Sequence, residues 1–386
     1  MEQKSLHQHC KFEVPEIIFG RGLLQQVGSC ARRLGGKKVF LVSDQGLFQA
    51  GWVDLAIRSL QDAGMKVVYF DQITSNPKDY EIEAGLREYV AQGSDVIVGL
   101  GGGSALDAAK GIAILSANGG QISDYKGNDK IHRPLPPLVL CPTTCGTGSD
   151  VSQFAVINDT GEMCKFTIMS RCIAPDISLT DPDTLRTLPD EYIGSTAIDA
   201  LSHAVEAYFS VASSTLTDVN ALQALTLLTK SFIPAVQERH ADNLEDLSRA
   251  SLHAGMAFSN ALLGIGHALA HPIGGLYDAN HGDVNAVLLP EVLKFDFPVV
   301  RQKIAGMVNA LGYKLESNEK FAEEMTIETV EKILAAAGVP RGLRNIGVKQ
   351  EDLSKLAARA MNDVCLLTSP RQTDVDDLLG ILKRSY

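Results

Sequence analysis

A carboxylate and three imidazoles are spaced so that they could build one metal site. Asp199 and His203 are four residues apart, so on a helix both side chains would share one face. His267 begins a second pair of this spacing with His271, and His281 lies in YDANHGD, whose Gly and Asn indicate a loop or a helix start. Three imidazoles and one carboxylate suit Fe²⁺ or Zn²⁺ better than Ca²⁺ or Mg²⁺, which prefer oxygen ligands. Any one of these histidines alone would more often be an ordinary core or surface residue, so the prediction of a metal site depends on the whole set.

Length and composition predict an ordinary globular protein of two domains. The chain has 386 residues, of which 45% are hydrophobic, enough for a sizeable core in each half. Asp and Glu (46) outnumber Lys and Arg (35), the net charge is −11, and the sequence contains no basic block interleaved with aromatic residues. We therefore expect neither a nucleic acid partner nor binding to anionic membrane surfaces.

The sequence also favours a cytoplasmic protein with reduced thiols. No apolar run reaches the length that spans a bilayer, and the first residues, MEQKSLHQHCKFEVPE, lack the apolar core of a secretory signal. The seven cysteines are odd in number and form no CxxC pair. Cys141 and Cys145 flank a Thr-rich turn, but no second pair completes a zinc site there.

The first half of the chain alternates short β-branched runs with amphipathic helical segments, which is typical of a doubly wound parallel sheet. The predicted strands are residues 16–20, 38–44, 66–71, 95–100 and 137–142, and helices are expected at 51–64 and 81–93. The first of these strands stands apart, and we expect it either to pair across a dimer or to form a hairpin.

From about residue 189 long helical periodicities replace the strands, so the second half is predicted to be all-α. We expect an α/β domain at residues 1–188, an all-α domain at 189–386, and a hinge at 181–192, where two prolines and several helix-capping residues occur.

A glycine cluster predicts a phosphate-binding turn in the first domain. After the apolar strand DVIVGL, the segment GGGSALDAAKGIAIL leads directly into a helix. Backbone N–H groups at Gly102, Gly103 and Ser104 could approach a pyrophosphate, and the helix N-terminus favours its negative charge. The cluster is not the usual GxGxxG pattern, so a tight turn that binds nothing is the alternative.

Two further features support a nucleotide and favour NAD over NADP. Asp44 ends the second predicted strand, where a carboxylate can accept hydrogen bonds from the adenosine ribose and repel a 2′-phosphate. Considered alone, Asp44 could equally be a simple turn or cap residue. Thr143, Thr144 and Thr147 lie in the hydroxyl-rich turn PTTCGTGSD and could contact the diphosphate or ribose.

Taken together, these motifs closely resemble the iron-containing (group III) alcohol dehydrogenase family from about residue 13 to the C-terminus. The matching segments are GGGSALDAAK, PTTCGTGSDVSQFAVI, IDALSHAVEAY, GHALAHPIGGLYDANHGDVNAVLLP and NDVCLLTSPR. The segment DVSQFAVI resembles the branch of ethanol-oxidation regulatory and 4-hydroxybutyrate-type dehydrogenases. The resemblance implies a dinucleotide-binding domain, an all-α domain with the active site in the cleft between them, and a homodimer or higher homo-oligomer.

The resemblance also implies roles for individual residues. It assigns one divalent metal, Fe²⁺ or Zn²⁺, to Asp199, His203, His267 and His281. The positions that line the NAD site would be Asp44, Asn76, Gly102, Gly103, Ser104, Thr143, Thr144, Thr147 and Lys165. His271 would move protons beside the metal, and Phe258 would line the substrate pocket. The implied activity is hydride transfer between NAD(H) and a small primary alcohol or aldehyde, with the metal acting as a Lewis acid on the substrate oxygen.

Three alternatives stay open at this point. A glycerol-dehydrogenase-like or a dehydroquinate-synthase-like enzyme would share the fold, but His203 is an extra ligand for both, and no Lys and Arg cluster for a phosphorylated substrate accompanies the ligands. A regulatory homologue with little turnover is the third. Two departures from the family pattern, Cys145 in the Thr-rich turn and Ser369 before Pro370, bear on substrate preference rather than on the chemistry.

Overall fold

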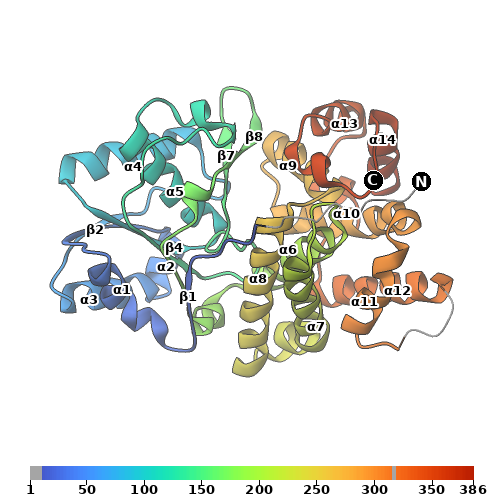
Figure 1. The fold of residues 1–386 in the computed structure, drawn as a ribbon, viewed down its shortest axis with the longest axis horizontal. Coiled ribbons are helices and arrows are strands. Elements are labelled where there is room, and N and C mark those ends of the chain that lie inside the picture. The colour runs from blue at the N-terminus through green and yellow to red at the C-terminus, as the bar shows by residue number, and fades with distance from the viewer. Residues whose placement is uncertain (1–10, 315–318) are drawn as a thin grey trace, which may run out of the picture.

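The computed structural model describes residues 11–314 and 319–386, which form an α/β half followed by a helical half (Figure 1). The strands are β1 (Glu16–Phe19), β2 (Lys38–Val42), β3 (Lys66–Phe70), β4 (Val96–Gly101), β5 (Gly127–Asn128), β6 (Leu138–Pro142), β7 (Phe154–Asp159), β8 (Cys164–Met169) and β9 (Ile177–Thr180). The helices of the first half are α1 (Val27–Arg33), α2 (Gln45–Gln49), α3 (Trp52–Asp62), α4 (Asp79–Gln92) and α5 (Gly103–Asn118).

Six of these strands form one parallel sheet in the order β1-β9-β6-β4-β2-β3. β3 lies on one side of β2, and β4 lies on the other side. The order in which strands are added to the sheet therefore reverses between β2 and β4. In open α/β sheets, ligands bind in the crevice at the carboxyl ends of the strands where this reversal occurs. The topology therefore brings Asp44, which follows β2, and Gly102, which follows β4, to the two sides of one crevice.

Alternating side chains along the strands form two cores, one on each face of the sheet. Phe40 and Ile97 point to the face covered by α4 and α5, where they pack with Leu106. Leu41 and Val98 point to the opposite face, which is covered by α1 and α3. Because both faces are buried, the strands read as continuous apolar runs, which is why their positions could be predicted.

A second, three-stranded sheet in the order β5-β8-β7 lies between the two halves of the molecule (Figure 1). β7 and β8 form an antiparallel pair, in which Asn158 pairs with Lys165. β8 contacts α9, and β7 contacts α5. This small sheet was not among the predicted strands, and it forms one wall of the site described below.

The helical half consists of nine helices in the residues described. They are α6 (Asp190–Phe209), α7 (Thr215–Glu238), α8 (Ala241–Ala261), α9 (Ile265–Tyr277), α10 (His281–Asp296), α11 (Arg301–Ala310), α12 (Glu319–Ala337), α13 (Leu353–Ala360) and α14 (Val375–Arg384). A large core joins α6, α7, α8, α11 and α12, and a smaller one joins α9, α10, α13 and α14. By length and composition α7 could cross a membrane, but it packs against α6 and α8 with Leu228 and Phe232 fully buried, as a core helix does.

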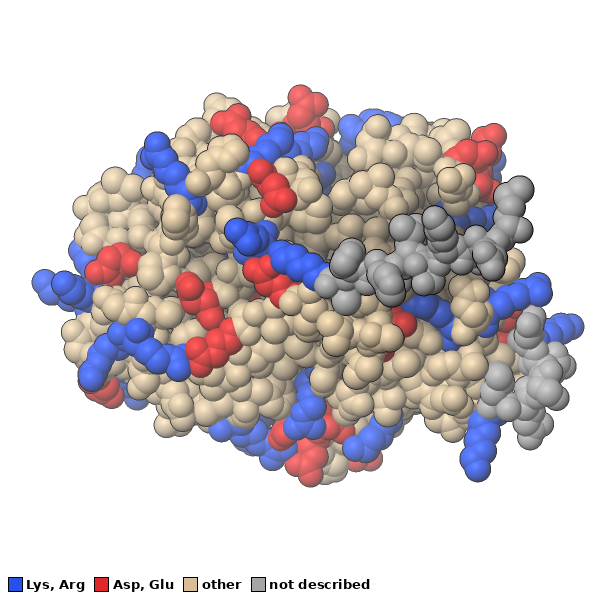
Figure 2. Space-filling model, in the orientation of Figure 1, with Lys and Arg blue, Asp and Glu red and all other residues tan. Residues whose placement is uncertain are grey.

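The predicted architecture is confirmed, with one error at the first strand. β1 does not form a hairpin, and because it is an edge strand, its pairing across a dimer stays a prediction. It pairs in parallel with β9, a strand that was not predicted, and so forms one edge of the large sheet. The predicted hinge segment contains a 3₁₀ helix at Pro182–Thr187, and its role as a hinge stays a prediction. On the face shown in Figure 2, acidic and basic side chains are interspersed.

Candidate active site

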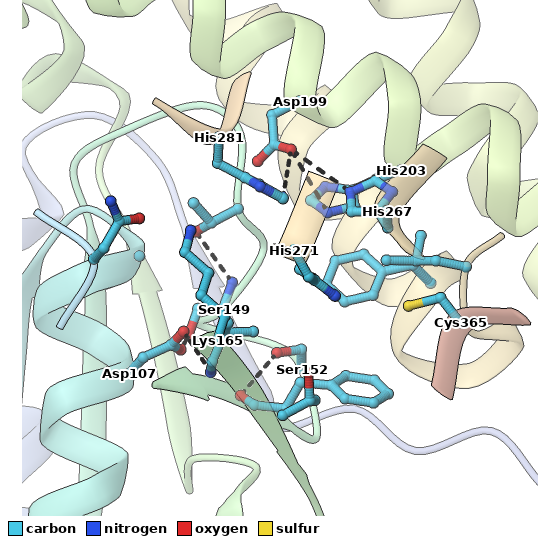
Figure 3. A pocket seen from close by; sticks show the side chains of 18 of the residues that line it. Asp107, Ser149, Ser152, Lys165, Asp199, His203, His267, His271, His281 and Cys365 are labelled. Atoms are coloured by element: carbon cyan, nitrogen blue, oxygen red, sulfur yellow. Dashed lines mark hydrogen bonds and ion pairs between the residues drawn. The ribbon is translucent and has the colours of Figure 1, made fainter. Parts of the chain in front are cut away.

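The four predicted metal ligands come from three helices and meet at one point. Asp199 and His203 lie one turn apart on α6, His267 lies in the first turn of α9, and His281 is the first residue of α10. The donor atoms of all four residues lie within 4.8 Å of one another. Figure 3 shows the Asp199 carboxylate facing the three imidazole rings.

The distances suit a four-coordinate divalent ion. Asp199 Oδ1 lies 3.9 Å from His203 Nε2, 3.8 Å from His267 Nε2 and 3.6 Å from His281 Nε2. Donors bound about 2.1 Å from a tetrahedral ion lie roughly 3.4 Å apart. The four side chains therefore need only a small contraction to share one ion, and the donor set of three nitrogens and one oxygen suits Fe²⁺ or Zn²⁺.

A close contact between α6 and α10 brings His281 to Asp199. A Cβ atom on Gly282 would lie 2.1 Å from the backbone oxygen of Ser195, so only glycine lets the start of α10 pack this closely on α6. The Asn280 side chain caps α10 by accepting a hydrogen bond from the Asp283 N–H. The cap and the glycine together fix the helix start on which His281 lies.

Glu206 orients the ligand His267 and was not predicted. Its Oε2 accepts hydrogen bonds from His267 Nδ1 at 2.6 Å and from the Gly264 N–H at 3.0 Å, and its Oε1 accepts one from the Gly266 N–H at 2.5 Å. A carboxylate that holds the second nitrogen of a ligating histidine fixes the ring and makes it a stronger ligand. Since Glu206 follows His203 by three residues on α6, helical spacing could have revealed it.

Asn285 is a second polar neighbour of the ligands that was not predicted. It lies one turn after His281, and its Nδ2 donates to Asp199 Oδ1 at 2.8 Å. The same nitrogen lies 3.2 Å from His267 Nε2 and 3.3 Å from His281 Nε2. Asn285 Oδ1 and His281 Nδ1 are both buried without a hydrogen-bond partner.

The electrostatics favour neutral His203 and His281, protonated His267 and an ionised Asp199. Burial lowers the pKa of His203 to about 4 and lowers that of His281 well below its usual value. Burial opposes the charge on Asp199, yet His203 and the other imidazoles hold the pKa of its carboxyl below the usual range. Burial likewise disfavours protonated His267, but Glu206 and Asp199 raise its pKa to about 9. Two buried carboxylates therefore face this cluster, and a bound dication would compensate their charge.

The glycine-rich turn lies at the carboxyl end of β4, beside the crevice where open α/β sheets bind ligands. Gly102 is the N-cap of α5 and offers no side chain to the helix N–H groups, which leaves them free for a ligand. A Cβ atom on Gly103 would lie 2.7 Å from Thr147 Cγ2, so glycine is needed for the Thr-rich turn to pack here. Ser104 Oγ accepts a hydrogen bond from the Asn76 N–H at 3.1 Å.

The Thr-rich turn links this phosphate-binding turn to the metal ligands. Thr147 packs on Gly103, and the preceding residue, Gly146, accepts a hydrogen bond from His203 Nδ1 at 3.2 Å through its backbone oxygen. The Thr143 N–H donates to the Gly101 oxygen at 3.0 Å. One short segment therefore holds both the predicted nucleotide site and one metal ligand.

Asp44 lies beside the glycine turn and also caps α2. Its carboxylate accepts a hydrogen bond from the Leu47 N–H at 3.1 Å, and burial raises the pKa of its carboxyl. A Cβ atom on Gly101 would lie 3.5 Å from Asp44 Oδ2. Asp44 is therefore a helix cap, as the alternative interpretation expected. The cap uses Oδ1, so Oδ2 could still accept a hydrogen bond from a ligand.

Asn76, in the loop between β3 and α4, and Lys165, on β8, line the same cavity. Asn76 has a left-handed backbone (φ 54°), and its Nδ2 donates to Asp278 Oδ1 at 2.6 Å, which joins the α/β half to the end of α9. Burial lowers the pKa of Lys165 to about 8, against the opposing effect of Asp278. Figure 3 places Lys165 near Asp107 and Ser149, across the cavity from the metal ligands.

A cavity of about 150 Å³ brings most of the predicted residues together. Its lining includes Asn76, Gly103, Ser104, Thr147, Lys165, Asp199, His203, Phe258, His267, His271 and His281. Apolar side chains complete it, and Phe258 stacks on the His203 ring with centroids 4.3 Å apart. Four predicted residues are not among the lining residues and lie in or beside the glycine turn: Asp44, Gly102, Thr143 and Thr144.

The two departures from the family pattern do not line this cavity. The Cys145 thiol is buried against α6, where Thr196 Oγ1 lies 3.3 Å away, and burial raises its pKa to about 11. Ser369 Oγ donates to the Arg371 backbone oxygen at 2.9 Å. Any effect of either residue on substrate preference would therefore be indirect.

Comparison with known proteins identifies the family over nearly the whole chain. The family description "Iron-containing alcohol dehydrogenase" matches residues 15–182, and "Fe-containing alcohol dehydrogenase family, C-terminal" matches residues 193–386. A 1,3-propanediol dehydrogenase of Citrobacter freundii is 37% identical over 380 residues, 97% of this chain and 98% of the relative. An NAD-dependent methanol dehydrogenase of Bacillus methanolicus is 33% identical over 376 residues, 97% of this chain and 99% of the relative.

Solved structures agree with this relationship. A 1,3-propanediol oxidoreductase has a TM-score of 0.95 at 36% identity, with 98% of this chain and 100% of the other covered. An alcohol dehydrogenase from Oenococcus oeni gives the same TM-score and coverage at 32% identity. The chain therefore belongs to the iron-containing alcohol dehydrogenase family, which confirms the predicted fold class, the use of NAD(H) and a divalent metal, and the reaction class of hydride transfer on a small alcohol or aldehyde.

Proposed function

We propose that the chain oxidises a short primary alcohol or diol, or reduces the corresponding aldehyde, with Asp199, His203, His267 and His281 as the metal ligands. The observation that carries this proposal is the convergence of four donor atoms within 4.8 Å on the wall of a small cavity whose other side is the glycine turn. The relatives described above are named for alcohol, diol or methanol dehydrogenation, which favours this activity over the glycerol-dehydrogenase-like and dehydroquinate-synthase-like alternatives.

The nucleotide would lie across the carboxyl ends of β2 and β4. The N–H groups at the start of α5, near Gly102 and Ser104, would bind the diphosphate, with Thr143, Thr144 and Thr147 beside them. Asp44 would accept hydrogen bonds from the ribose and exclude a 2′-phosphate. Asn76 and Lys165, which line the cavity beyond the glycine turn, would contact the nicotinamide half.

Each side chain near the metal ligands would have a separate task. A bound divalent ion supplies Lewis acidity, which favours loss of the alcohol proton. His271 lies beside the ligands, with its ring stacked on His281 at 5.8 Å between centroids, and would take up or return that proton. Phe258 and its apolar neighbours would exclude water from the carbon that gives up the hydride.

The size and polarity of the cavity limit the substrate. The space is about 150 Å³, and its wall near His203 is formed by Phe154, Phe258 and other apolar side chains. A short carbon chain fits these limits, and the apolar wall disfavours a sugar with several hydroxyl groups. We therefore propose C2–C4 primary alcohols, including 1,3-propanediol, as the substrate class.

An assay of NADH formation tests this proposal. Protein loaded anaerobically with Fe²⁺ or Zn²⁺ is mixed with NAD⁺ and ethanol, 1-propanol or 1,3-propanediol. NADH should form with these three short alcohols, and His281→Ala should abolish it. His240→Ala, which removes an exposed histidine outside the cavity, is the matched control. A loaded wild-type protein that forms no NADH with any short alcohol would contradict the proposal and favour the low-turnover regulatory alternative.

We also propose how the chain divides into domains, that it forms oligomers, and where in the cell it is found. We propose domains at residues 1–188 and 189–386, with the active site in the cleft between them, because the site takes residues from β8, α6, α9 and α10. A homodimer or higher homo-oligomer and a cytoplasmic location are proposed from the family resemblance and from the composition. Analytical ultracentrifugation would measure the oligomeric state. Placement in the ethanol-oxidation regulatory or 4-hydroxybutyrate-type branch stays a prediction.

A further inference from the structure

The carboxylate of Asp363 contacts His271 on the side away from the reactive cavity. His271 lines both the reactive cavity and a second, more polar cavity of about 310 Å³, whereas Asp363 lines only the second. Asp363 comes from the loop between α13 and α14, 92 residues along the chain from His271. Neither the sequence motifs nor the proposed metal and nucleotide sites assign it a role.

Both oxygens of this carboxylate are held in place. Asp363 Oδ2 lies 2.7 Å from His271 Nδ1, and Oδ1 accepts a hydrogen bond from the Cys365 N–H at 2.9 Å, which caps a 3₁₀ helix at Val364–Thr368. The Asp363 side chain is only 14% exposed. The next two residues, Val364 and Cys365, line the reactive cavity itself. The same short helix therefore positions the carboxylate and closes the cavity.

This contact determines which nitrogen of His271 carries its hydrogen. An ionised carboxylate can only accept hydrogen bonds, so Nδ1 must be the donor. A neutral imidazole has one N–H, so Nε2 is left as an acceptor. His271 lines the reactive cavity, and an acceptor there could take up a proton from an alcohol, whereas an N–H could not.

We propose that Asp363 is a positioning residue that fixes the tautomer of His271 in which Nε2 is a proton acceptor. This inference rests on the proposed function, since it describes how His271 is prepared for its part in the reaction. As the alcohol is oxidised, its O–H bond breaks and an N–H bond forms at Nε2, while the hydride leaves the carbon and reduces NAD⁺. Asp363 itself takes up no proton.

The substitution Asp363→Asn isolates this role. The asparagine Oδ1 can still accept from the Cys365 N–H, because Asn caps a helix as well as Asp does. Its Nδ2 would then face His271 Nδ1 and donate to it, which forces the hydrogen of the ring onto Nε2. The variant should therefore keep its fold and reverse the tautomer.

Nitrogen NMR of ¹⁵N-histidine-labelled, zinc-loaded protein reads the tautomer directly. In the wild type, the signal that disappears in His271→Gln should show a protonated Nδ1, and in Asp363→Asn it should show a protonated Nε2. Asp376→Asn changes an exposed aspartate of α14 in the same way and should leave the signal unchanged. An unchanged tautomer in Asp363→Asn would overturn the proposal.

Kinetics provide the second measurement. Asp363→Asn should lower kcat about 10²–10⁴-fold, the range for loss of a general acid or base, with metal content and NAD⁺ affinity unchanged. His271→Ala should cause a similar loss, and Asp363→Asn should cause no further loss in that background. Losses that multiply, or a loss of metal in Asp363→Asn, would overturn the proposal. A wild type that forms no NADH would contradict the proposed function, and the tautomer signal would still decide the role of Asp363.

Discussion

Replacing Glu206 by Gln removes the charge that orients a metal ligand while keeping the size of the side chain. Glu206 accepts from His267 Nδ1, the Gly264 N–H and the Gly266 N–H through its two oxygens. In Gln an NH₂ group replaces one oxygen, so at least one of these buried donors faces another donor. A hydrogen bond to a charged group contributes about 1.5–3 kcal/mol. The loss of one such bond corresponds to about a 10–100-fold weaker metal affinity, the range seen for outer partners of metal ligands.

The assay for Glu206→Gln is competition for Zn²⁺ with a colorimetric chelator. The expected result is a Kd raised about 10–100-fold, with kcat largely recovered at saturating metal. Glu191→Gln, at an exposed position in the first turn of the same helix, is the control and should bind as the wild type does. An unchanged Kd in Glu206→Gln would refute the reasoning that Glu206 strengthens His267 as a ligand.

Three further predictions follow from single residues. Asp44→Gly should admit NADP⁺, measured as the ratio of kcat/KM for NADP⁺ and NAD⁺; an unchanged ratio would show that Asp44 does not discriminate between them. His281→Ala should reduce metal content far below one ion per chain while NAD⁺ still binds, and full metal retention would remove His281 from the ligand set. Burial raises the pKa of Asp296 from 3.8 to about 8, so the folded protein keeps a proton that the unfolded chain loses, and stability falls as the pH rises through this window. Asp296→Asn should therefore raise the free energy of unfolding by on the order of 1–4 kcal/mol at pH 8 and by little at pH 4, measured by chemical denaturation; an equal effect at both pH values would contradict this pKa.

The part of the site that could be predicted depends on the spacing of residues that are close in the sequence. Asp199 and His203 share a face because α6 is helical, and the glycines before α5 form a turn because they follow a buried strand. The convergence of His267 and His281 on the same point depends on how α9 and α10 pack against α6. That packing is a tertiary property, so it entered the sequence analysis only as an expectation.

The features that were missed depend on long-range contacts or weak patterns. β9 has four residues, and its pairing with β1 joins segments at opposite ends of the α/β half, so no local pattern shows it. β7 and β8 mix polar and apolar residues because one face of their sheet is more buried than the other. Glu206 and Asn285 follow ligands at helical spacing and could have been found. Asp363 could not, because its contact with His271 is made between a loop and a distant helix.

The central claim is that one divalent ion is bound by Asp199, His203, His267 and His281. Anomalous diffraction from crystals of the purified protein, recorded at the iron and zinc absorption edges, tests it most directly. We expect one strong peak per chain, about 2.0–2.2 Å from one oxygen of the aspartate and from Nε2 of each histidine. A peak elsewhere, for example among His271, Asp363 and Cys365, whose donor atoms also cluster, or no peak in a catalytically active crystal, would contradict it.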